Sequence, residues 1–129
     1  MGESPVMPSV LVIDDEEGNR LWLLRRLRAE GFEVEAVEGG QDGLQRLRER
    51  RFDLVLLDLF MPQLDGLETL DRLKSDPTLA RLPVIMLTAS KERTSVAHAL
   101  SLGAVDYILK PFRLPDLLGR LRRQLPRPG

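Results

Sequence analysis

Hydrophobic residues fall into five short runs along the chain, and stretches with helical spacing separate these runs. The runs at 54–57 (Leu-Val-Leu-Leu) and 84–87 (Val-Ile-Met-Leu) are continuously apolar, as is typical of parallel strands covered on both faces. The run Glu33–Val37 alternates between polar and apolar side chains, which favours an edge strand. The pattern predicts five strands, at Ser9–Asp14, Glu33–Val37, Leu54–Asp58, Val84–Thr88 and Ala104–Lys110.

Leucine-rich stripes with helical spacing occupy the segments between and after these strands. The last stripe is the strongest, because its leucines fall at i, i+3, i+4, i+7 and i+11 and so predict an amphipathic helix. Glycines beside several other stripes indicate where helices begin or end. The stripes are Leu23, Leu24 and Leu27 before Gly31; Leu44 and Leu47 after Gly39-Gly40; Leu67, Leu70 and Leu73; Val96, Ala97 and Leu100 before Gly103; and Leu114, Leu117, Leu118, Leu121 and Leu125.

Strands that alternate with helices predict an α/β protein with a doubly wound, five-stranded parallel sheet, helices on both faces and right-handed crossovers. A chain of 129 residues suits a single domain, and that length buries a core without disulfide or metal staples. We expect residues 9–125 to form this domain, residues 1–8 to form a flexible leader, and residues 126–129 to form a tail or the start of a linker.

Composition excludes several classes of protein. The 19 basic and 20 acidic residues give a net charge of −1. This overall charge does not favour binding to nucleic acid. The chain has no cysteine and a single histidine, so a disulfide scaffold, a thiolate metal site, a cysteine nucleophile and a two-histidine metal motif are excluded. No apolar run approaches the ~20 residues of a membrane span, and the amino terminus lacks the charged-then-apolar pattern of a signal peptide. We therefore expect a soluble, cytoplasmic protein without a membrane partner.

Sixteen of the basic residues are arginine, and they cluster at 25–28, 46–51 and 120–123. Such clusters occur in nucleic-acid-binding surfaces, but here acidic residues interleave with them and no aromatic platform accompanies them. We interpret the clusters as solvated helix faces, with a nucleic-acid surface as the less favoured alternative.

Polar side chains end four of the five predicted strands. Asp14 and Asp15 end the first strand, and the third, fourth and fifth strands end in Asp58, Thr88 and Lys110. Ligands of open parallel sheets bind at the carboxyl ends of the strands, so we expect these groups to converge. Each residue alone has an ordinary structural explanation, as a helix cap, a turn residue, a strand end or a surface charge. Their joint arrival at one edge of the sheet favours a functional site.

The chemistry of such a site follows from its charges. Three clustered carboxylates repel one another unless a cation lies between them, and oxygen ligands in a partly open shell suit Mg²⁺. One carboxylate can then act as a nucleophile and form an aspartyl-phosphate. Lys110 and Thr88 would receive the charge of the phosphoryl oxygens.

Four motifs in order resemble the response-regulator receiver domain, the phosphorylated half of bacterial two-component systems. The resemblance covers about Ser9 to Leu125. The motifs are Val10-Leu-Val-Ile-Asp14-Asp15-Glu16, Phe52-Asp-Leu-Val-Leu-Leu-Asp58-Leu-Phe-Met61-Pro62-Gln-Leu-Asp65-Gly66, Pro83-Val-Ile-Met-Leu-Thr88-Ala89, and Gly103-Ala-Val-Asp-Tyr107-Ile-Leu-Lys110-Pro111-Phe112.

The resemblance implies a role for each matched residue. Asp58 resembles the phosphoacceptor, and the Mg²⁺ (or Mn²⁺) ligands are expected to be Asp14, Asp15, Asp58 and the backbone carbonyl of Phe60. Thr88, the backbone of Ala89 and Lys110 are expected to bind the phosphoryl group. Thr88 and Tyr107 resemble the switch pair, which would reshape the face formed by the fourth helix, the fifth strand and the fifth helix. The bond Lys110-Pro111 is expected to be cis, and the strand order 2-1-3-4-5, as in flavodoxin-like folds.

The resemblance also implies partners. A sensor histidine kinase or a phosphotransfer protein would donate the phosphoryl group, and a downstream protein target or an effector domain would receive the signal. Nucleic acid would be a partner only if the domain is part of a longer regulator. Such a receiver catalyses its own Mg²⁺-dependent phosphorylation and slow dephosphorylation, so we do not expect an enzyme that turns over an external substrate.

Two positions differ from the common pattern or stay open. Phe60 is bulky and apolar where many relatives carry a polar side chain, and its ring could hinder the water that hydrolyses an acyl phosphate. Alternatively, Phe60 covers apolar surface or docks a partner. Ser90 is small and would leave the other side of the site open, so both residues are candidates for tuning dephosphorylation.

Two other functions compete with the receiver. A phosphatase with an aspartyl-phosphate intermediate needs a second acid two residues after the nucleophile, where this chain has Phe60. A phosphate-independent, receiver-like protein-interaction module remains the main alternative, although such modules normally lose the acidic pair, the acceptor or the lysine.

Overall fold

The computed structural model describes residues 7–61, 63–89 and 93–125. Most of the expected leader, the expected tail at 126–129 and the candidate residue Ser90 lie outside these described ranges. The expected domain limits therefore stay predictions. Among the described residues, no helix is both long and apolar enough to cross a membrane.

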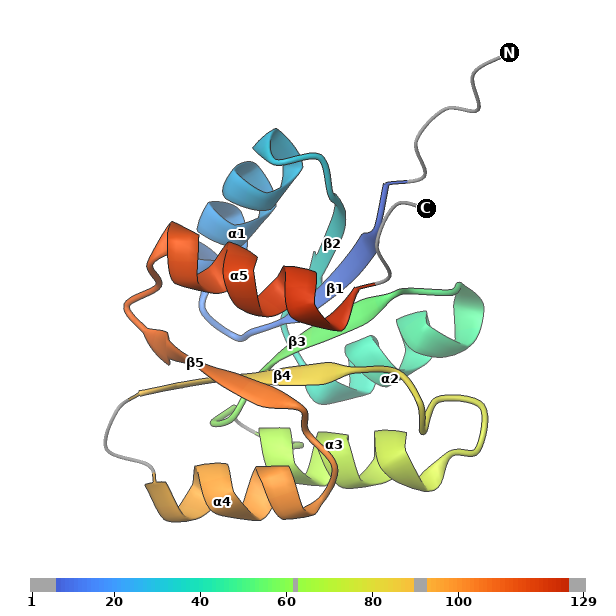
Figure 1. The fold of residues 1–129 in the computed structure, drawn as a ribbon. Helices are drawn as coiled ribbons and strands as arrows, with labels where there is room; N and C mark the ends of the chain where they lie inside the picture. The colour runs from blue at the N-terminus through green and yellow to red at the C-terminus, as the bar shows by residue number, and fades with distance from the viewer. Residues whose placement is uncertain (1–6, 62, 90–92, 126–129) are drawn as a thin grey trace.

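Five strands form one parallel sheet in the order β2-β1-β3-β4-β5, which confirms the predicted fold class and strand order (Figure 1). The alternating strand β2 lies at an edge of the sheet, as its pattern predicted. Strand limits differ from the predicted ones by no more than two residues. The strands are β1 (Ser9–Ile13), β2 (Glu33–Val37), β3 (Leu54–Asp58), β4 (Val84–Ala89) and β5 (Asp106–Lys110).

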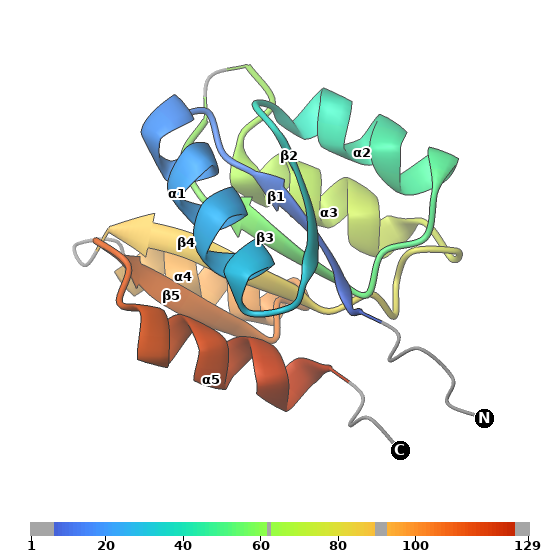
Figure 2. The same cartoon turned by 90° about the horizontal axis from the view of Figure 1, so that it is seen from above.

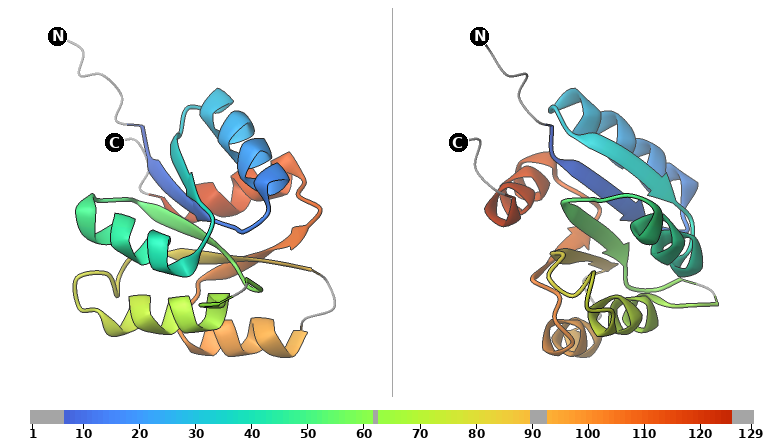
Figure 3. Two further views of the ribbon diagram at one scale, coloured as in Figure 1. Left: turned by 180° about the vertical axis from the view of Figure 1, so that it is seen from behind. Right: turned by 90° about the vertical axis from the view of Figure 1, so that its right-hand side faces the viewer.

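Helices cover both faces of the sheet, in two layers that Figures 1 and 2 show from the front and from above. One layer contains α1 and α5, and the other contains α2, α3 and α4. Two further views show that β1 starts and α5 ends at the same end of the sheet (Figure 3). The helices are α1 (Glu17–Ala29), α2 (Gly40–Glu49), α3 (Gly66–Ser75), α4 (Arg93–Ser101) and α5 (Leu114–Gln124).

The two central strands β3 and β4 are buried on both faces. The side chains of 54–57 and 84–87 have no solvent exposure, which confirms the interpretation of these continuously apolar runs. Alternate residues contribute to two separate hydrophobic clusters, one under each helical layer. Full burial of each such side chain stabilises the fold by about 1.5–3 kcal/mol, so the middle of the sheet is the most firmly held part of the molecule.

The fourth helix departs from its predicted stripe. Ala99 is fully buried, whereas Ala97 is exposed and Leu100 is 43% exposed. The buried face of α4 runs through Ala99 and the half-buried Val96, which pack in the cluster under α2, α3 and α4. The prediction placed the helix and Val96 correctly, but it wrongly assigned Ala97 and Leu100 to the inner face in place of Ala99.

The turn between β3 and α3 brings the start of α3 against the end of β3. A Cβ atom at Gly66 would clash with the Asp58 carbonyl oxygen and would lie 2.7 Å from the Leu59 Cα. The amide of Gly66 donates a hydrogen bond to the Leu59 carbonyl at 3.0 Å, and the Asp65 side chain caps α3 by accepting from the Glu68 amide at 2.9 Å. The position of Asp58 therefore depends on a glycine at 66.

Replacing Gly66 by alanine should lower the free energy of unfolding by about 1–3 kcal/mol, because the new methyl group has no space beside the backbone of Asp58 and Leu59. Gly119→Ala is the matched control. It lies in the middle of α5 with no atom within 4 Å of the added carbon, so it should stabilise the protein by about 0.5–1 kcal/mol. Urea unfolding measures both changes, and equal stability of the two variants would contradict the close packing at Gly66.

Candidate functional site

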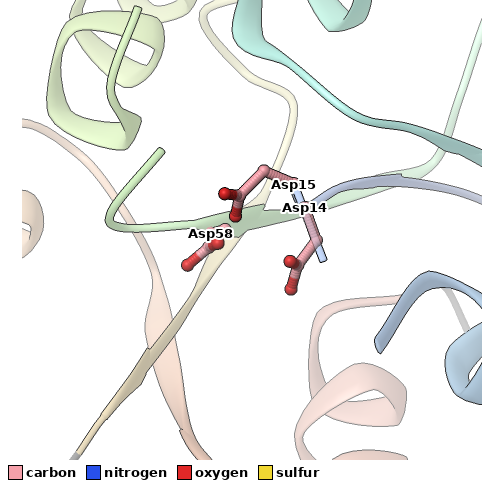
Figure 4. A group of neighbouring side chains, drawn as sticks. All are labelled: Asp14, Asp15 and Asp58. Carbon is pink, nitrogen blue, oxygen red and sulfur yellow. The ribbon is translucent and has the colours of Figure 1, made fainter. Parts of the chain in front are cut away.

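Three carboxylates gather at the carboxyl edge of the sheet (Figure 4). Asp58 ends β3, and Asp14 and Asp15 follow β1 directly. Asp14 and Asp58 are 0% and 3% exposed, whereas Asp15 is exposed. Each of the three side chains offers an oxygen within 4.8 Å of the other two. The structure therefore brings together the acidic residues that the sequence predicted would converge.

Lys110, at the end of β5, supplies the positive charge of this edge. Its Nζ lies 3.2 Å from Asp58 Oδ1 and 3.3 Å from Asp14 Oδ2. Burial disfavours the charged form of Lys110, but the neighbouring Asp58 and Asp14 carboxylates outweigh it and raise the pKa of the ammonium group. Lys110 thus remains protonated, and its ammonium group pairs with both buried carboxylates. The bond between Lys110 and Pro111 is cis, as expected.

One ammonium group does not balance three carboxylates. Burial, followed by the negative charge of Asp14, raises the pKa of Asp58 to about 7, and Lys110 offsets only part of this shift. The donors are all oxygens, two of them buried and one exposed, which is the donor chemistry of a hard divalent cation that keeps some of its water. The residues present therefore fit Mg²⁺ or Mn²⁺.

Asp14 is fixed by three groups that the sequence analysis did not identify. The Glu16 amide donates to Asp14 Oδ1 at 2.9 Å, and Asn19 Nδ2 donates to Asp14 Oδ2 at 3.4 Å. Arg20 Nη1 donates to the Asp14 carbonyl at 2.8 Å. Asn19 and Arg20 come from the first turns of α1, and only the rotation of that helix aims them back at the loop, so no spacing rule could have found them.

Thr88 lies one strand away from Asp58 and slightly beyond it. Strands β3 and β4 pair Asp58 with Leu87, so the buried Thr88 is the next residue along β4. Its hydroxyl donates to the carbonyl of Ala89 at 3.2 Å. Thr88 is therefore beside the acidic group, with its hydroxyl bonded within its own strand.

The two predicted aromatic positions lie in different surroundings. Phe60, two residues after Asp58, is 51% exposed, and its amide lies 3.4 Å from Asp58 Oδ1 as a weak donor. Tyr107, on the edge strand β5, is half-buried and packs against the cluster under α2, α3 and α4. The guanidinium carbon of Arg120 lies 5.6 Å from the centre of the Tyr107 ring, and Arg120 also pairs with Asp106 and Asp116.

Comparison with known proteins agrees with this geometry. The family model described as the response regulator receiver domain matches residues 10–122. The phosphate regulon transcriptional regulatory protein PhoB of Rhizobium meliloti is 41% identical over 122 residues, which cover 95% of this chain and 54% of PhoB. The chain thus spans about half the length of the curated relatives it matches.

Solved structures show the same architecture. The chemotaxis protein CheY4 of Vibrio cholerae superposes with a TM-score of 0.88 at 29% identity, over 93% of this chain and 100% of that one. The receiver domain of the sensor histidine kinase PA1611 from Pseudomonas aeruginosa superposes with a TM-score of 0.84 at 28% identity, over 92% of this chain and 98% of that one. That structure is described as holding a magnesium ion coordinated in the active site cleft.

Replacing Asp58 by asparagine should stabilise the protein when no divalent cation is present. The pKa of Asp58 rises from an ordinary value of 3.8 to about 7 in the folded protein, so the stability linked to this group is lost as the pH rises between those values. Above about pH 7, Asp58→Asn should therefore unfold at a higher temperature than the unsubstituted protein, and the difference should shrink at lower pH.

Thermal unfolding across this pH range, with and without MgCl₂, measures the effect. Added Mg²⁺ should stabilise the unsubstituted protein more than the variant, because a ligand that binds the folded state raises its stability. Asp42→Asn, which removes an exposed carboxylate from α2, controls for net charge. A pH-independent difference would contradict the raised pKa of Asp58, and an equal gain from Mg²⁺ in both variants would contradict a cation site that includes Asp58.

Proposed function

Because the chain belongs to the response regulator receiver domain family, we propose that Asp58 accepts the phosphoryl group that switches it. The function of the family is phosphorylation-activated signalling in two-component systems, and its members do not turn over external substrates. The observation that supports Asp58 as the phosphoacceptor is its ion pair with the Lys110 ammonium group, which also pairs with the buried Asp14. A phosphate-independent interaction module is disfavoured, because the acidic pair, the acceptor and the lysine are all present.

The proposed metal site uses Asp14, Asp15, Asp58 and the backbone carbonyl of Phe60. The grouping of the three carboxylates and the magnesium ion in the related receiver of PA1611 support it. When bound, Mg²⁺ would supply positive charge between the carboxylates and the incoming phosphoryl oxygens. The hydrogen bonds from Glu16, Asn19 and Arg20 would hold Asp14 in place for this role.

In the proposed transfer, a carboxylate oxygen of Asp58 attacks the phosphorus of a phosphohistidine. A P–O bond to Asp58 forms and the P–N bond to the donor imidazole breaks. The imidazole nitrogen keeps the electron pair of that bond and takes up a proton from water. Lys110 favours the ionised, nucleophilic form of Asp58 and remains beside the phosphoryl oxygens after transfer. Positioning and charge stabilisation are the main requirements of such a reaction.

The proposed switch uses Thr88, the backbone of Ala89 and Tyr107. The Thr88 hydroxyl gives up its bond to the Ala89 carbonyl and turns to the phosphoryl group, which the Ala89 amide also binds. The space beside Thr88 then admits the Tyr107 ring, which leaves Arg120. Because Arg120 belongs to α5, the face formed by α4, β5 and α5 changes shape, and a partner that prefers one shape reads the change.

The proposed donor is a sensor histidine kinase or a phosphotransfer protein, and the proposed receiver of the signal is a separate protein or an effector domain. The similar protein PhoB is named a transcriptional regulatory protein, and this chain covers 54% of it. Nucleic acid would be reached through such a domain. We propose a cytoplasmic location, in keeping with soluble partners of this kind.

Intact mass spectrometry after incubation with acetyl phosphate tests the proposal. One phosphoryl group should be added in the presence of Mg²⁺ and none after chelation, since the carboxylates need a cation to approach an anionic donor. Asp58→Asn should remain unlabelled. If a folded sample shows no adduct while a known receiver is labelled in parallel, the result would favour a phosphate-independent interaction module instead.

Replacing Phe60 by asparagine should shorten the lifetime of the phosphorylated protein severalfold. The exposed Phe60 ring beside Asp58 would hinder the approach of the attacking water, and a small polar side chain would admit and orient it. Phosphate release after removal of the donor measures the rate. Phe60→Leu, which keeps an apolar group of similar bulk, should stay slow; an unchanged rate in Phe60→Asn would assign Phe60 to surface packing or partner docking.

A further inference from the structure

The opposite end of the sheet contains a hollow that the phosphorylation site does not use. It has a volume of about 800 Å³ and lies where α2 ends, β3 begins and the loop before β4 passes, with Gln124 of α5 at its rim. In Figure 1 this is the right-hand end of the molecule. Four arginines line it, and they come from two separate segments: Arg48, Arg50 and Arg51 from the end of α2 and the following turn, and Arg81 from the loop before β4.

One of these arginines is fully engaged by the protein itself. Arg50 pairs with Glu35 at 3.1 Å and with Glu33 at 3.4 Å, and its guanidinium carbon lies 4.4 Å from the centre of the Phe52 ring. Arg50 therefore forms part of the wall and contributes to the packing of α2 against β2.

The acidic residues of the rim are engaged as well. Glu49 pairs with Arg46 at 3.5 Å, outside the hollow, and Asp53 accepts from the amide and the hydroxyl of Ser9 at 2.8 Å and 3.2 Å. Asp76, the acid whose charge interacts with Arg48, already accepts two hydrogen bonds from Thr78. One oxygen of Asp53 and one of Asp76 are thus held by these hydrogen bonds, and Glu49 pairs outside the hollow.

The remaining three arginines form no close ion pair among the described residues, although the charge of Arg48 interacts with that of Asp76. Arg48, Arg51 and Arg81 are exposed, and in the ranges 7–61, 63–89 and 93–125 no carboxylate oxygen lies within 4 Å of their guanidinium nitrogens. Beside them the hollow has an apolar floor that includes the half-buried Leu82 and Pro83. Three planar guanidinium groups therefore surround a small apolar patch.

We propose that this arginine hollow, formed by Arg48, Arg51 and Arg81 with Leu82 and Pro83, binds an acidic segment of a protein partner. Guanidinium groups pair with carboxylates through two parallel hydrogen bonds, and leucine side chains of the same segment would cover the floor. Charge complementarity of this kind raises the association rate and selects the partner.

Two other occupants fit the hollow less well. A second copy of this chain would have to insert its own acidic edge, and this head-to-tail contact would build rings or open-ended assemblies and cover Asp58. Duplex DNA requires an extended positive stripe along its phosphates, whereas this hollow is concave. An acidic peptide meets neither obstacle.

A fluorescein-labelled peptide of glutamates with a leucine at every fourth position is the probe, and fluorescence anisotropy is the readout. The double variant Arg51→Glu/Arg81→Glu should weaken binding about tenfold, because each exposed ion pair contributes modestly, and added salt should weaken binding of the unsubstituted protein. Arg25→Glu is the matched control, since Arg25 is exposed in the other helical layer. Its effect should be small.

Asp58→Asn separates this proposal from the phosphorylation site. The arginine hollow lies at the other end of the sheet, so this variant should bind the peptide normally even if Asp58 proves not to be the phosphoacceptor. Circular dichroism of every variant confirms the fold. Equal binding by the double variant and Arg25→Glu, no binding at low salt, or tighter binding of a labelled DNA duplex through the same arginines would overturn the proposal.

Discussion

One ammonium group among three carboxylates is the interaction on which the rest of this structure depends. Lys110 Nζ lies within 3.3 Å of both Asp14 and Asp58, and these two acids are almost completely removed from water. Burying charges is costly unless opposite charges meet with good geometry. They meet here because β1, β3 and β5 all end at one edge of a parallel sheet, and because Gly66 lets α3 begin directly against Asp58.

In the same arrangement one ammonium group faces three carboxylates, so the charges of the site do not balance. Burial, followed by the charge of Asp14, raises the pKa of Asp58, and Lys110 offsets only part of this rise. In the proposed function, a divalent cation and a phosphoryl group would add favourable contacts at this edge. A group that gains contacts only after phosphorylation shifts the protein between two conformations. In the proposed switch, the side chains that respond are Thr88, which is hydrogen-bonded within its own strand, and Tyr107, which lies beside Arg120.

Much of this could be predicted from the sequence, because the relevant signals are local. Continuous apolar runs identified β3 and β4, and polar residues at strand ends identified Asp14, Asp58 and Lys110. Signals that depend on packing were missed. The inner face of α4 runs through Ala99 rather than Leu100, since its packing on β4 and α3 sets its rotation. The rotation of α1 brings Asn19 and Arg20 to Asp14. Strand order came from the family resemblance, since hydrophobic periodicity does not encode it.

The most direct test of the account is to locate the phosphoryl group on the chain. Borohydride reduction of the phosphorylated protein converts an aspartyl-phosphate into homoserine, and peptide mass spectrometry then identifies the altered residue. The account predicts homoserine at position 58 alone, formed only when Mg²⁺ was present during phosphorylation. Homoserine at position 14 or 15, or a phosphoryl group that survives borohydride on a serine or threonine, would contradict the assignment of Asp58 as the nucleophile beside Lys110.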